Sequence, residues 1–514
     1  MTDPILNERM NDSMNDITAK ITRAGYTLYN HQTDGIRWML SRELEATSFK
    51  GGFLCDDPGL GKTLQTLSLI AGNSEGGRNL IICPVSLLEQ WRDAAKKIFP
   101  DARLRICHGP NGSFSNKTEI ETSDPFITIA SYSKVFDTEK GEYKKTILHT
   151  VMWERIICDE VHTIRNKNSK VFKGCHDIKA KYRWGLSGTP LQNKVDDLQT
   201  LFRFLHVGEV RIKDDLEGLK TECVMRRNRH ILPDAYKGLG IHIDDIDFMD
   251  DEEKNFYHNL KDEVRKEFIR VSQDEKNVMS TIFELLLRLR QATIHPSLVY
   301  NGLYRKYAED PETDPRDLKA LLSKIRYWGK RPSTKMTKLL EYFSNHTNIT
   351  KSLIFSHFTE EAVLIRKFLL TDFPTLRVEI FDGSLSLEQR NDMIKRARNG
   401  EIDCMIVQIM AGGVGLNLQM FNKVYITTPD WNPSNEIQAI ARCHRIGQMS
   451  DVEVIKIVIK EDGEKPTIDE RIIMVQQNKR ELMAHHLTDE TLKFNENIKG
   501  SLNLTMKDFA YLLK

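Results

Sequence analysis

Three groups of residues have side chains and spacings that suit the binding and cleavage of a phosphate anhydride. The first is DDPGLGKT (Asp56–Thr63), between an apolar run and a helical pattern. Its two glycines let backbone N–H groups converge on phosphate oxygens, and a helix N-terminus adds a favourable dipole. Lys62 would reach the β- and γ-phosphates, and the Thr63 hydroxyl would bind Mg²⁺. The strict pattern has Gly where this chain has Asp56, so an ordinary Gly-rich strand–helix turn stays open.

The second group is DEVH (Asp159–His162), which follows the apolar run RIIC. An acid at the end of a strand beside a phosphate loop is a ligand of Mg²⁺, directly or through water, and this role falls to Asp159. Glu160 would orient or deprotonate the attacking water, because hydrolysis needs a base in line with the γ-phosphate. The alternative is an acidic strand end that caps a helix.

The third group is a pair of arginines, Arg442 and Arg445, at the end of a predicted helix in QAIARCHRIGQ. Residues spaced three apart share a helical face, so both guanidinium groups can reach one ligand. If they donate hydrogen bonds to a γ-phosphate, they would stabilise the charge of the transition state as arginine fingers. A solvated basic helix face is the alternative.

The elements that must position these residues follow a repeated pattern of strand and helix. Apolar strand candidates alternate with helical stretches from about residue 52 to 205, and the same pattern returns after Lys351. Such alternation is typical of a parallel sheet covered by helices. The first set of strand candidates is GGFLCD, NLIICP, PFITIA, RIICDE and RWGLSG, and the second is KSLIFS, RVEIFD, CMIVQI, KVYITT and EVIKIVI. The sequence therefore predicts an α/β protein of two lobes.

Composition limits the classes of protein and partner. The chain has 514 residues, with 74 Lys and Arg against 73 Asp and Glu, so a nucleic-acid partner would need a local basic patch. Its apolar runs are too short to span a membrane, and its polar N-terminus lacks the pattern of a signal peptide. The eight cysteines have no metal-ligand spacing, which predicts a reduced intracellular protein without zinc.

Read in order, many short blocks resemble the motifs of superfamily 2 helicase-like ATPases. The blocks are YNHQTDGIRWM, DDPGLGKT, IICPVSLLEQW, ITIASY, DEVHTIRN, LSGTPLQN, LIFSHF, FDGSLSLEQR, QIMAGGVGLNL, TPDWNPSNEIQA and RCHRIGQ. AGGVGLNL, WNP and HRIGQ narrow the resemblance to the Swi/Snf-type (sucrose-non-fermenting) DNA-dependent ATPases. Within them, the chain is nearest to the repair-linked and Lodestar-like subgroups, without the RING that many repair-linked members carry.

This resemblance implies two RecA-like lobes with ATP and Mg²⁺ bound between them. It implies that Gln32 reads the adenine, and that Ser187–Asn193 couples the nucleotide state to DNA contact. The catalytic residues it implies are Lys62, Asp159, Glu160, Arg442 and Arg445, and the metal ligands are Thr63 and Asp159. The nucleotide-binding residues it implies are Gln32, Asp56, Asp57, Pro58, Gly59, Leu60, Gly61, Lys62, Thr63, Gly415 and Gln438.

The domain boundaries follow from the motifs and from a charged, helix-prone segment between the two patterns. We expect an N-terminal tail over 1–24, a first lobe over 25–210, a helical insert with linker over 211–335, a second lobe with a helical brace over 336–485, and a C-terminal helical tail over 486–514. Candidate DNA contacts are Pro84–Ser86, Ser131–Tyr132, Phe355–Ser356, Asp382–Ser384 and two basic runs, Met225–His230 and Gly329–Lys335, each of which could also be a solvated face or linker.

The expected activity is ATP-driven translocation on double-stranded DNA by a monomeric motor that remodels or displaces DNA-bound proteins. Strand separation on DNA or RNA is an alternative, and a nucleotide-dependent scaffold that no longer hydrolyses ATP is another. The intact set of catalytic residues argues against the scaffold: Lys62, Asp159, Glu160, Arg442 and Arg445. We expect an intracellular protein, located in the nucleus if the source is a cell and in the virion or replication site if it is a large DNA virus.

Overall fold

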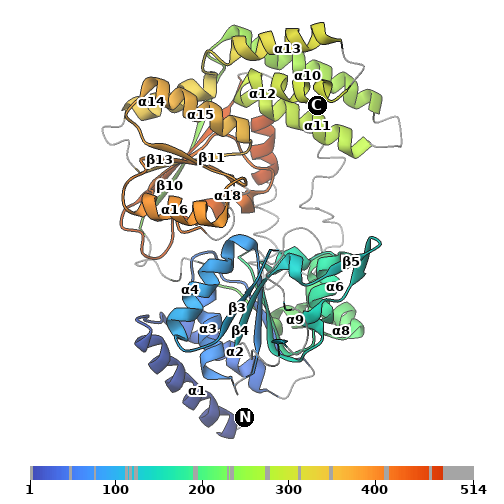
Figure 1. Ribbon diagram of the computed structural model, residues 1–514, viewed down its shortest axis with the longest axis vertical. Coiled ribbons are helices and arrows are strands. Elements are labelled where there is room, and N and C mark those ends of the chain that lie inside the picture. Colours follow the sequence, from blue (N-terminus) through green and yellow to red (C-terminus); the bar gives the residue numbers. More distant parts are fainter. Residues whose placement is uncertain are drawn as a thin grey trace. The chain divides into compact units, whose positions relative to one another are not determined.

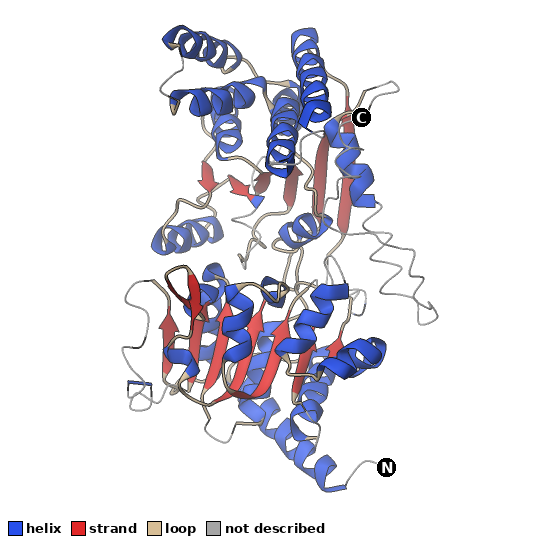
Figure 2. Ribbon diagram, turned by 90° about the vertical axis from the view of Figure 1, so that its right-hand side faces the viewer, coloured by secondary structure: helices blue, strands red, loops and turns tan. Residues whose placement is uncertain are grey.

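The protein folds into two compact units. The computed structural model describes residues 4–45, 49–74, 77–109, 114, 119–120, 126–188, 195–228, 231, 237–271, 278–310, 314–345, 351–409, 416–461 and 466–477. Unit 1 comprises Met1–Tyr236 with Val414–Leu416, and unit 2 comprises Lys237–Gly413 and Asn417–Lys514. Each unit contains its own parallel sheet (Figures 1 and 2), which confirms the prediction of two α/β lobes.

Unit 1 is built on a parallel sheet whose central strands are buried on both sides. Its strands, within the described residues, are β1 (Gly51–Leu54), β2 (Asn79–Cys83), β3 (Leu104–Cys107), β4 (Ile127–Ser131), β7 (Trp153–Asp159), β8 (Ala180–Leu186) and β9 (Val224–Met225), in the order β3-β4-β2-β7-β8-β1-β9. The five predicted strands are confirmed, and β3 and β9 are additional edge strands. A separate exposed hairpin joins β5 (Asp137–Glu139) and β6 (Glu142–Lys144).

Helices cover both faces of this sheet (Figure 2), because successive side chains of a strand point to opposite faces. Leu80 and Ile82 enter one core and Ile81 enters the other. One face carries α1 (Pro4–Arg23), α2 (Asn30–Leu44), α3 (Lys62–Gly72) and α4 (Leu88–Ile98), and the other carries α6 (Lys170–Asp177), α7 (Val195–Phe204), α8 (Glu209–Asp214) and α9 (Leu216–Cys223).

Two predicted boundaries differ from the structure of unit 1. Residues 1–24 were expected to be a tail, but α1 packs Met14, Ile17 and Ile21 into the core beside α3. The insert was expected to begin at 211, but α8, α9 and β9 belong to unit 1, since β9 pairs with β1. Unit 1 therefore extends further in both directions than the motifs indicate.

Unit 2 contains the second parallel sheet and the helical insert. Its described strands are β10 (Leu239–Ile246), β11 (Ser352–Ser356), β12 (Val378–Phe381), β13 (Cys404–Gln408), β14 (Lys423–Ile426) and β15 (Val452–Ile459), in the order β10-β15-β14-β11-β13-β12. The five predicted strands are confirmed. β10, which lies inside the predicted insert, is instead an edge strand parallel to β15.

The helices of unit 2 form two groups (Figure 1). Those packed with or following the strands are α14 (Thr334–Asn345), α15 (Thr359–Asp372), α16 (Leu387–Arg398) and α18 (Pro433–Ile440). The insert helices are α10 (Asp251–Val271), α11 (Val278–Ile294), α12 (Pro296–Ala308) and α13 (Pro315–Trp328). Three of them share a small core with the helix over 468–477, through buried residues such as Tyr257, Leu286, Val299 and Ile472.

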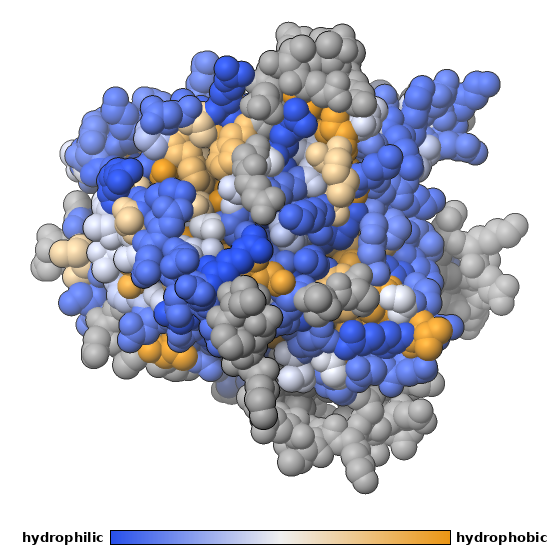
Figure 3. All heavy atoms as spheres, turned by 90° about the horizontal axis from the view of Figure 1, so that it is seen from below, coloured by the Kyte–Doolittle hydropathy of each residue, from blue (hydrophilic) through white to orange (hydrophobic). Residues whose placement is uncertain are grey.

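The surface and the cysteines agree with the composition. On the face shown in Figure 3, hydrophilic side chains predominate and apolar ones form only small patches. All eight cysteines are buried and free. Among the described residues, no helix has the length and apolarity that a membrane crossing requires, and no group of three or more His, Cys, Asp or Glu residues is placed to hold a metal ion. The expected C-terminal tail over 486–514 lies outside the described residues.

Candidate active site

The phosphate loop runs from the end of β1 to the start of α3. Gly59 and Gly61 have φ values of 98° and 82°, in the left-handed region that favours glycine. A Cβ on Gly61 would stand 2.3 Å from Nε2 of Gln32, so this position also has no room for a side chain. Leu60 between them is fully buried and anchors the loop. The backbone thus takes the turn that opens the N-terminus of α3.

Lys62 is the first residue of α3. Its ammonium group donates to the carbonyl oxygens of Asp56 at 2.7 Å and Asp57 at 3.5 Å, so the side chain lies back over the loop. Thr63, which follows it, is half-buried in the first helical turn. Backbone N–H groups of a first turn, a lysine and a hydroxyl fit a nucleotide phosphate and its cation.

Asp159 ends β7 at the same edge of the sheet, because the carboxyl ends of parallel strands lie together. Its Oδ2 accepts from Nε1 of Trp91 at 2.8 Å, and its Oδ1 accepts from the backbone N–H of Glu160 at 2.9 Å. Burial, and next the neighbouring Glu160 carboxylate, raise the pKa of the Asp159 carboxyl, while Lys62 acts to lower it. Carboxylate oxygens are the ligands that Mg²⁺ prefers, so the donor set fits this cation.

Glu160 has an unusual backbone and a carboxylate with one buried oxygen. Its φ of 52° lies in the left-handed region, where a side chain other than glycine is strained. Its Oε2 lies 3.5 Å from Nδ1 of His162 and accepts no hydrogen bond from any described residue. Burial, followed by Arg165, lowers the pKa of His162 to about 4, so this histidine is neutral at physiological pH. A buried carboxylate oxygen that accepts no hydrogen bond is suited to act as a general base, because it can accept a proton from a bound water molecule.

Gln32 lies in the first turn of α2 and contacts the phosphate loop. Its Oε1 accepts from the N–H of Tyr29 at 3.0 Å, and its Nε2 donates to the carbonyl of Leu60 at 3.3 Å. A ring nitrogen of His31 lies 3.0 Å from the same carbonyl. The structure therefore joins Gln32 to the loop, while its role toward adenine stays a prediction.

Of the site residues predicted from the second lobe, three are described and belong to unit 2: Gln438, Arg442 and Arg445. Gln438 is on α18, which ends at Ile440, so Arg442 and Arg445 lie in the turns that follow and not on one helical face. The carbonyl of Arg442 accepts from the N–H of Leu418 at 3.0 Å. Gly415 and residues 189–193 of the predicted coupling motif lie outside the described residues. The finger role of the two arginines stays a prediction.

From the sequence, one site residue, Trp91, was missed, and the partner of another, Asp56, was not foreseen. Trp91 ends the block IICPVSLLEQW, for which core packing was favoured over stacking on a ligand, yet its indole N–H donates to Asp159; a buried tryptophan needs an acceptor, and this was the available signal. Asp56 was assigned to the nucleotide, but its carboxylate is fully buried and bound by Arg227 at 2.5 Å. The local pattern carried no sign of that pairing, which joins residues 171 positions apart.

The candidate DNA contacts divide by exposure. Ser131 and Ser356 are buried, whereas Gly383 and Ser384 are exposed. In the run Gly329–Lys335, Lys335 is buried in an ion pair with Asp469 at 2.6 Å. Lys335 therefore has a structural role in that run, whereas the loop Asp382–Ser384 presents exposed groups.

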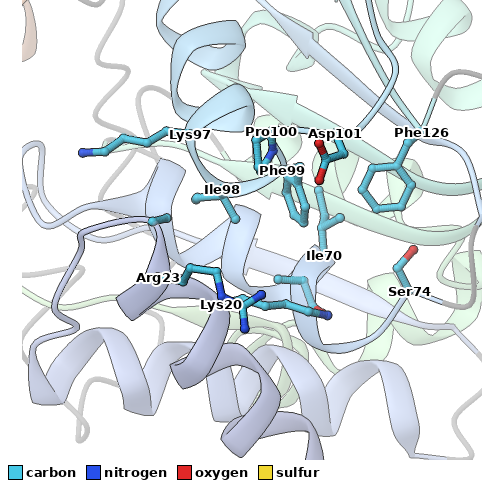
Figure 4. Close-up of a pocket in the computed structure, with 12 residues that line it drawn as sticks. Lys20, Arg23, Ile70, Ser74, Lys97, Ile98, Phe99, Pro100, Asp101 and Phe126 are labelled. Atoms are coloured by element: carbon cyan, nitrogen blue, oxygen red, sulfur yellow. The ribbon is translucent and has the colours of Figure 1, made fainter.

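A cavity of about 400 Å³ also lies in unit 1, near the end of α3 (Figure 4). Lys20, Arg23 and Lys97 line it together with Phe99 and Phe126. None of the predicted nucleotide residues is among the described residues around it. Because Phe126 precedes β4, the cavity lies at the amino edge of the sheet, whereas ligands of open parallel sheets bind at the carboxyl edge. It is not the nucleotide site.

Comparison with known proteins identifies the family. The SNF2-related domain matches residues 31–222, and the helicase conserved C-terminal domain matches residues 334–447. Together the two matches span more than half of the chain. They include the phosphate loop, Asp159 and Glu160 in the first domain, and Gln438, Arg442 and Arg445 in the second.

Individual proteins that resemble the chain include two curated relatives and one solved structure. The chain is 29% identical over 502 residues to the "Probable global transactivator" of Orgyia pseudotsugata multicapsid polyhedrosis virus, covering 93% of this chain and 94% of that protein. It is 26% identical over 592 residues to the "DNA repair protein rad8" of Schizosaccharomyces pombe, covering 84% of this chain but 52% of that protein. A solved structure, the Sulfolobus solfataricus SWI2/SNF2 ATPase core in complex with dsDNA, is 26% identical and covers 90% of this chain and 93% of its own, with a TM-score of 0.38. The chain belongs to the Swi/Snf-type superfamily 2 helicase-like ATPases and is a nucleic-acid-dependent ATPase.

Proposed function

We propose that this protein uses ATP hydrolysis to move along double-stranded DNA and to displace or remodel proteins bound there. The observation that carries the proposal is the arrangement in unit 1, where Lys62, Asp159 and Glu160 lie at one edge of the sheet. Family membership supplies ATP as the fuel. The name of one relative refers to DNA repair, and that of another, from Drosophila melanogaster, to transcription termination, which supports DNA as the track.

In this proposal, each residue of unit 1 has one task. Lys62 leaves the carbonyls of Asp56 and Asp57 and binds the β- and γ-phosphates. Thr63 and Asp159 would hold Mg²⁺, which when bound neutralises charge on the phosphates. Glu160 takes a proton from the attacking water through its Oε2. Gln32 and the backbone of Asp57–Gly61 hold the rest of the nucleotide.

Unit 2 supplies the groups that make turnover depend on a conformational change. We assign Arg442 and Arg445 to the developing charge on the γ-phosphate, and Gln438 and Gly415 to the surrounding contacts, because they fall in the matched second domain and its neighbouring motif. Since Gln438, Arg442 and Arg445 come from a different unit than Lys62, turnover would require the two units to close and product release would let them open.

Repeated closure while phosphates are held gives translocation without base recognition. The exposed loop Asp382–Ser384 offers hydroxyl and backbone groups to phosphates, which suits sequence-independent contact. We propose that DNA-bound proteins are the targets and that the protein acts inside the cell.

The deciding experiment measures ATP hydrolysis without nucleic acid and with duplex DNA, single-stranded DNA and RNA. We expect the strongest stimulation by duplex DNA. Lys62→Ala should lose more than 100-fold in rate, and Glu160→Gln should bind ATP but fall by a similar factor, within the range that transition-state groups contribute. If RNA or single strands stimulate best, the proposal fails.

Movement without strand separation requires a second readout. The protein and ATP should displace a third strand from a DNA triplex formed on a duplex track, while a forked duplex of equal length stays paired. Unwinding of the fork at the same rate would favour a strand-separating helicase. If ATP is not hydrolysed under any of these conditions, the result would favour a scaffold.

A further inference from the structure

The chain segment after β9 lies along the first half of the phosphate loop. β9 pairs with β1, and the ladder continues beyond it: the N–H of Cys55 donates to the carbonyl of Met225 at 2.7 Å, and the N–H of Asp57 donates to the carbonyl of Arg227 at 2.9 Å. Unit 2 begins at Lys237, so this is the last described strand contact before the chain leaves unit 1. This segment after β9 (residues 226–228), which we call the exit segment, is thus hydrogen-bonded directly to the phosphate loop.

Arg227 adds side-chain bonds to three different elements. Its Nε donates to Oδ1 of Asp56 at 2.9 Å and its Nη2 to Oδ2 at 2.5 Å, a two-pronged pair with a fully buried carboxylate. Nη2 also donates to Oε1 of Gln65 on α3 at 2.8 Å, and Nη1 donates to the carbonyl of His31 on α2. Only a guanidinium presents donors in such a fixed fork.

Gly35, in the middle of α2, is an independent sign that this arrangement is specific. A Cβ there would lie 2.0 Å from Oε1 of Gln65 and 2.6 Å from Nη2 of Arg227. Glycine inside a helix costs about 1 kcal/mol relative to alanine. The helix thus leaves space at the point where Arg227 and Gln65 meet.

Two of the three residues that accept hydrogen bonds from Arg227 adjoin or bind a predicted nucleotide residue. Asp56 fixes Lys62 through its carbonyl at 2.7 Å. His31 directly precedes Gln32 in α2. The contacts of Arg227 therefore converge on the two ends of the ATP site, the phosphate side and the predicted base side.

We propose that Arg227 is a positioning residue of the ATP site: through Asp56, Gln65 and the carbonyl of His31 it sets the placement of Lys62 and Gln32. It acts through these neighbours and does not touch the nucleotide. Because it belongs to the exit segment toward unit 2, its bonds also tie the connection between the units to the phosphate loop. The proposal rests on the ATP site described above, but not on the type of nucleic acid that the protein follows.

The test compares Arg227→Ala with Arg37→Ala in the full chain. Arg37 is the matched control, because it is an exposed arginine of α2 whose side chain makes no hydrogen bond or ion pair with another described residue. Binding of a fluorescent ATP analogue without nucleic acid is measured first, followed by kcat and KM. We expect Arg227→Ala to raise Kd and KM at least tenfold, with kcat at saturating ATP reduced less than threefold. Arg37→Ala should keep the wild-type values.

Two further variants separate positioning from a general loss of stability. Arg227→Lys keeps the charge but loses the fork, so its Kd should lie between those of wild type and Arg227→Ala. Asp56→Asn should raise Kd on its own, and adding it to Arg227→Ala should have little extra effect, because the two residues act as one pair. If Arg227→Ala lowers Tm but keeps the wild-type Kd, or if the two effects simply add, the proposal is wrong. Should Arg227→Ala not fold, the Arg227→Lys and Asp56→Asn comparison decides in the same way.

Failure of this proposal and failure of the proposed function give different results. If duplex DNA does not stimulate ATP hydrolysis, the proposed translocase function is wrong, but the Kd values of wild type and Arg227→Ala still test the positioning role. An unchanged Kd in Arg227→Ala would overturn the positioning role while duplex stimulation remained.

Discussion

The carboxylate of Asp159 is held by a side chain whose role goes beyond packing. The Trp91 indole is fully buried and donates to Oδ2 at 2.8 Å, so it fixes one oxygen of the proposed Mg²⁺ ligand. Groups of this kind orient a ligand and commonly change metal affinity by 10–100-fold. Asp159 thus depends on a residue of α4 as well as on its own strand.

We therefore predict that Trp91→Phe weakens the use of Mg²⁺. The variant keeps the aromatic bulk and removes the donor, so half-maximal ATPase activity should require about tenfold more Mg²⁺. A titration of Mg²⁺ at saturating ATP measures this. Trp184→Phe is the control, because Trp184 donates to Glu43 and not to the site. Equal Mg²⁺ dependence in both variants would contradict the prediction.

Glu253 is a buried acid outside the site. Its Oε2 accepts from the N–H and the hydroxyl of Thr334, both at 2.8 Å, and burial raises the pKa of its carboxyl to about 7. Asp250 also raises this pKa, and Lys335 opposes the shift. A carboxyl with a raised folded-state pKa favours folding at low pH, and this contribution is lost as pH rises through the folded value.

We accordingly predict that the free energy of unfolding falls between about pH 4.5 and pH 7 by on the order of 2 kcal/mol from this group. Glu253→Gln should remove that part of the slope, since an amide does not ionise. Chemical denaturation at several pH values, wild type against variant, checks it. A difference between the two proteins that stays constant with pH would count against the assignment.

At the scale of elements, one arginine shapes the exposed loop before α16. Arg390 donates from Nε to the carbonyl of Leu385 at 3.0 Å, and from Nη2 to the carbonyls of Asp382 and Gly383 at 3.3 and 3.4 Å. Ser384 is in turn bonded to the carboxylate of Asp382. The loop is therefore held in one shape before any ligand arrives.

Arg390→Ala should lower affinity for duplex DNA about tenfold, because the loop would have to be ordered on binding. Fluorescence anisotropy with a labelled duplex measures the change, and ATP affinity should not move. Arg398→Ala, at the far end of the same helix and exposed, removes the same charge without touching the loop. If both variants weaken binding equally, charge and not loop shape is responsible.

α18 is anchored by a buried ionic group. Glu436 accepts from Lys456, from Nε2 of Gln476 at 2.7 Å and from the N–H of Asp430 at 2.8 Å. Since Gln476 belongs to the helix over 468–477, that helix holds α18 and with it the start of the turns carrying Arg442.

Removing this acid should be costly because it leaves a buried lysine unpaired. We predict that Glu436→Ala destabilises unit 2 by about 3–5 kcal/mol. Gln476→Ala loses the donor to Glu436 and to the carbonyl of Asp430 but leaves no unpaired buried charge, and should cost about 1.5–3 kcal/mol. Thermal unfolding of both variants gives the comparison, and a smaller effect for Glu436→Ala than for Gln476→Ala would refute it.

The elements show how far the sequence could be read. Strands with nearly continuous apolar residues were predicted, because burial on both faces leaves a clear pattern. β10 was missed since Ile241 and Ile243 are exposed on an edge strand with acidic neighbours. α1 was taken for a tail, although Met10, Met14, Ile17 and Ile21 have helical spacing; its polar composition hid that stripe.

The site residues divide in the same way. Lys62, Asp159 and Glu160 could be found because each lies in a short motif at the end of a strand. Arg227 could not, because its partner Asp56 is distant in sequence and only the pairing of β9 with β1 brings them together. The basic run Met225–His230 therefore gave no sign of a buried ion pair.

At the scale of the whole molecule, the two units have separate cores. Ile81 is buried in unit 1 and Ile354 in unit 2, each at the centre of its own sheet. We predict that calorimetry resolves two transitions, and that Ile81→Ala and Ile354→Ala each lower a different one, by about 2–5 kcal/mol. Only the transition lowered by Ile81→Ala should rise when ATP is added. A single transition shifted by both variants would show that the units unfold together.

The left-handed backbone of Glu160 has a consequence for any attempt to improve this protein by selection. A side chain at this φ is disfavoured by roughly 1–2 kcal/mol, a penalty that glycine avoids. A library of variants screened only for thermal stability should therefore enrich Gly at residue 160. These proteins would be more stable but would no longer hydrolyse ATP. A screen that also demands activity should retain Glu there, so the two screens would diverge at this one codon.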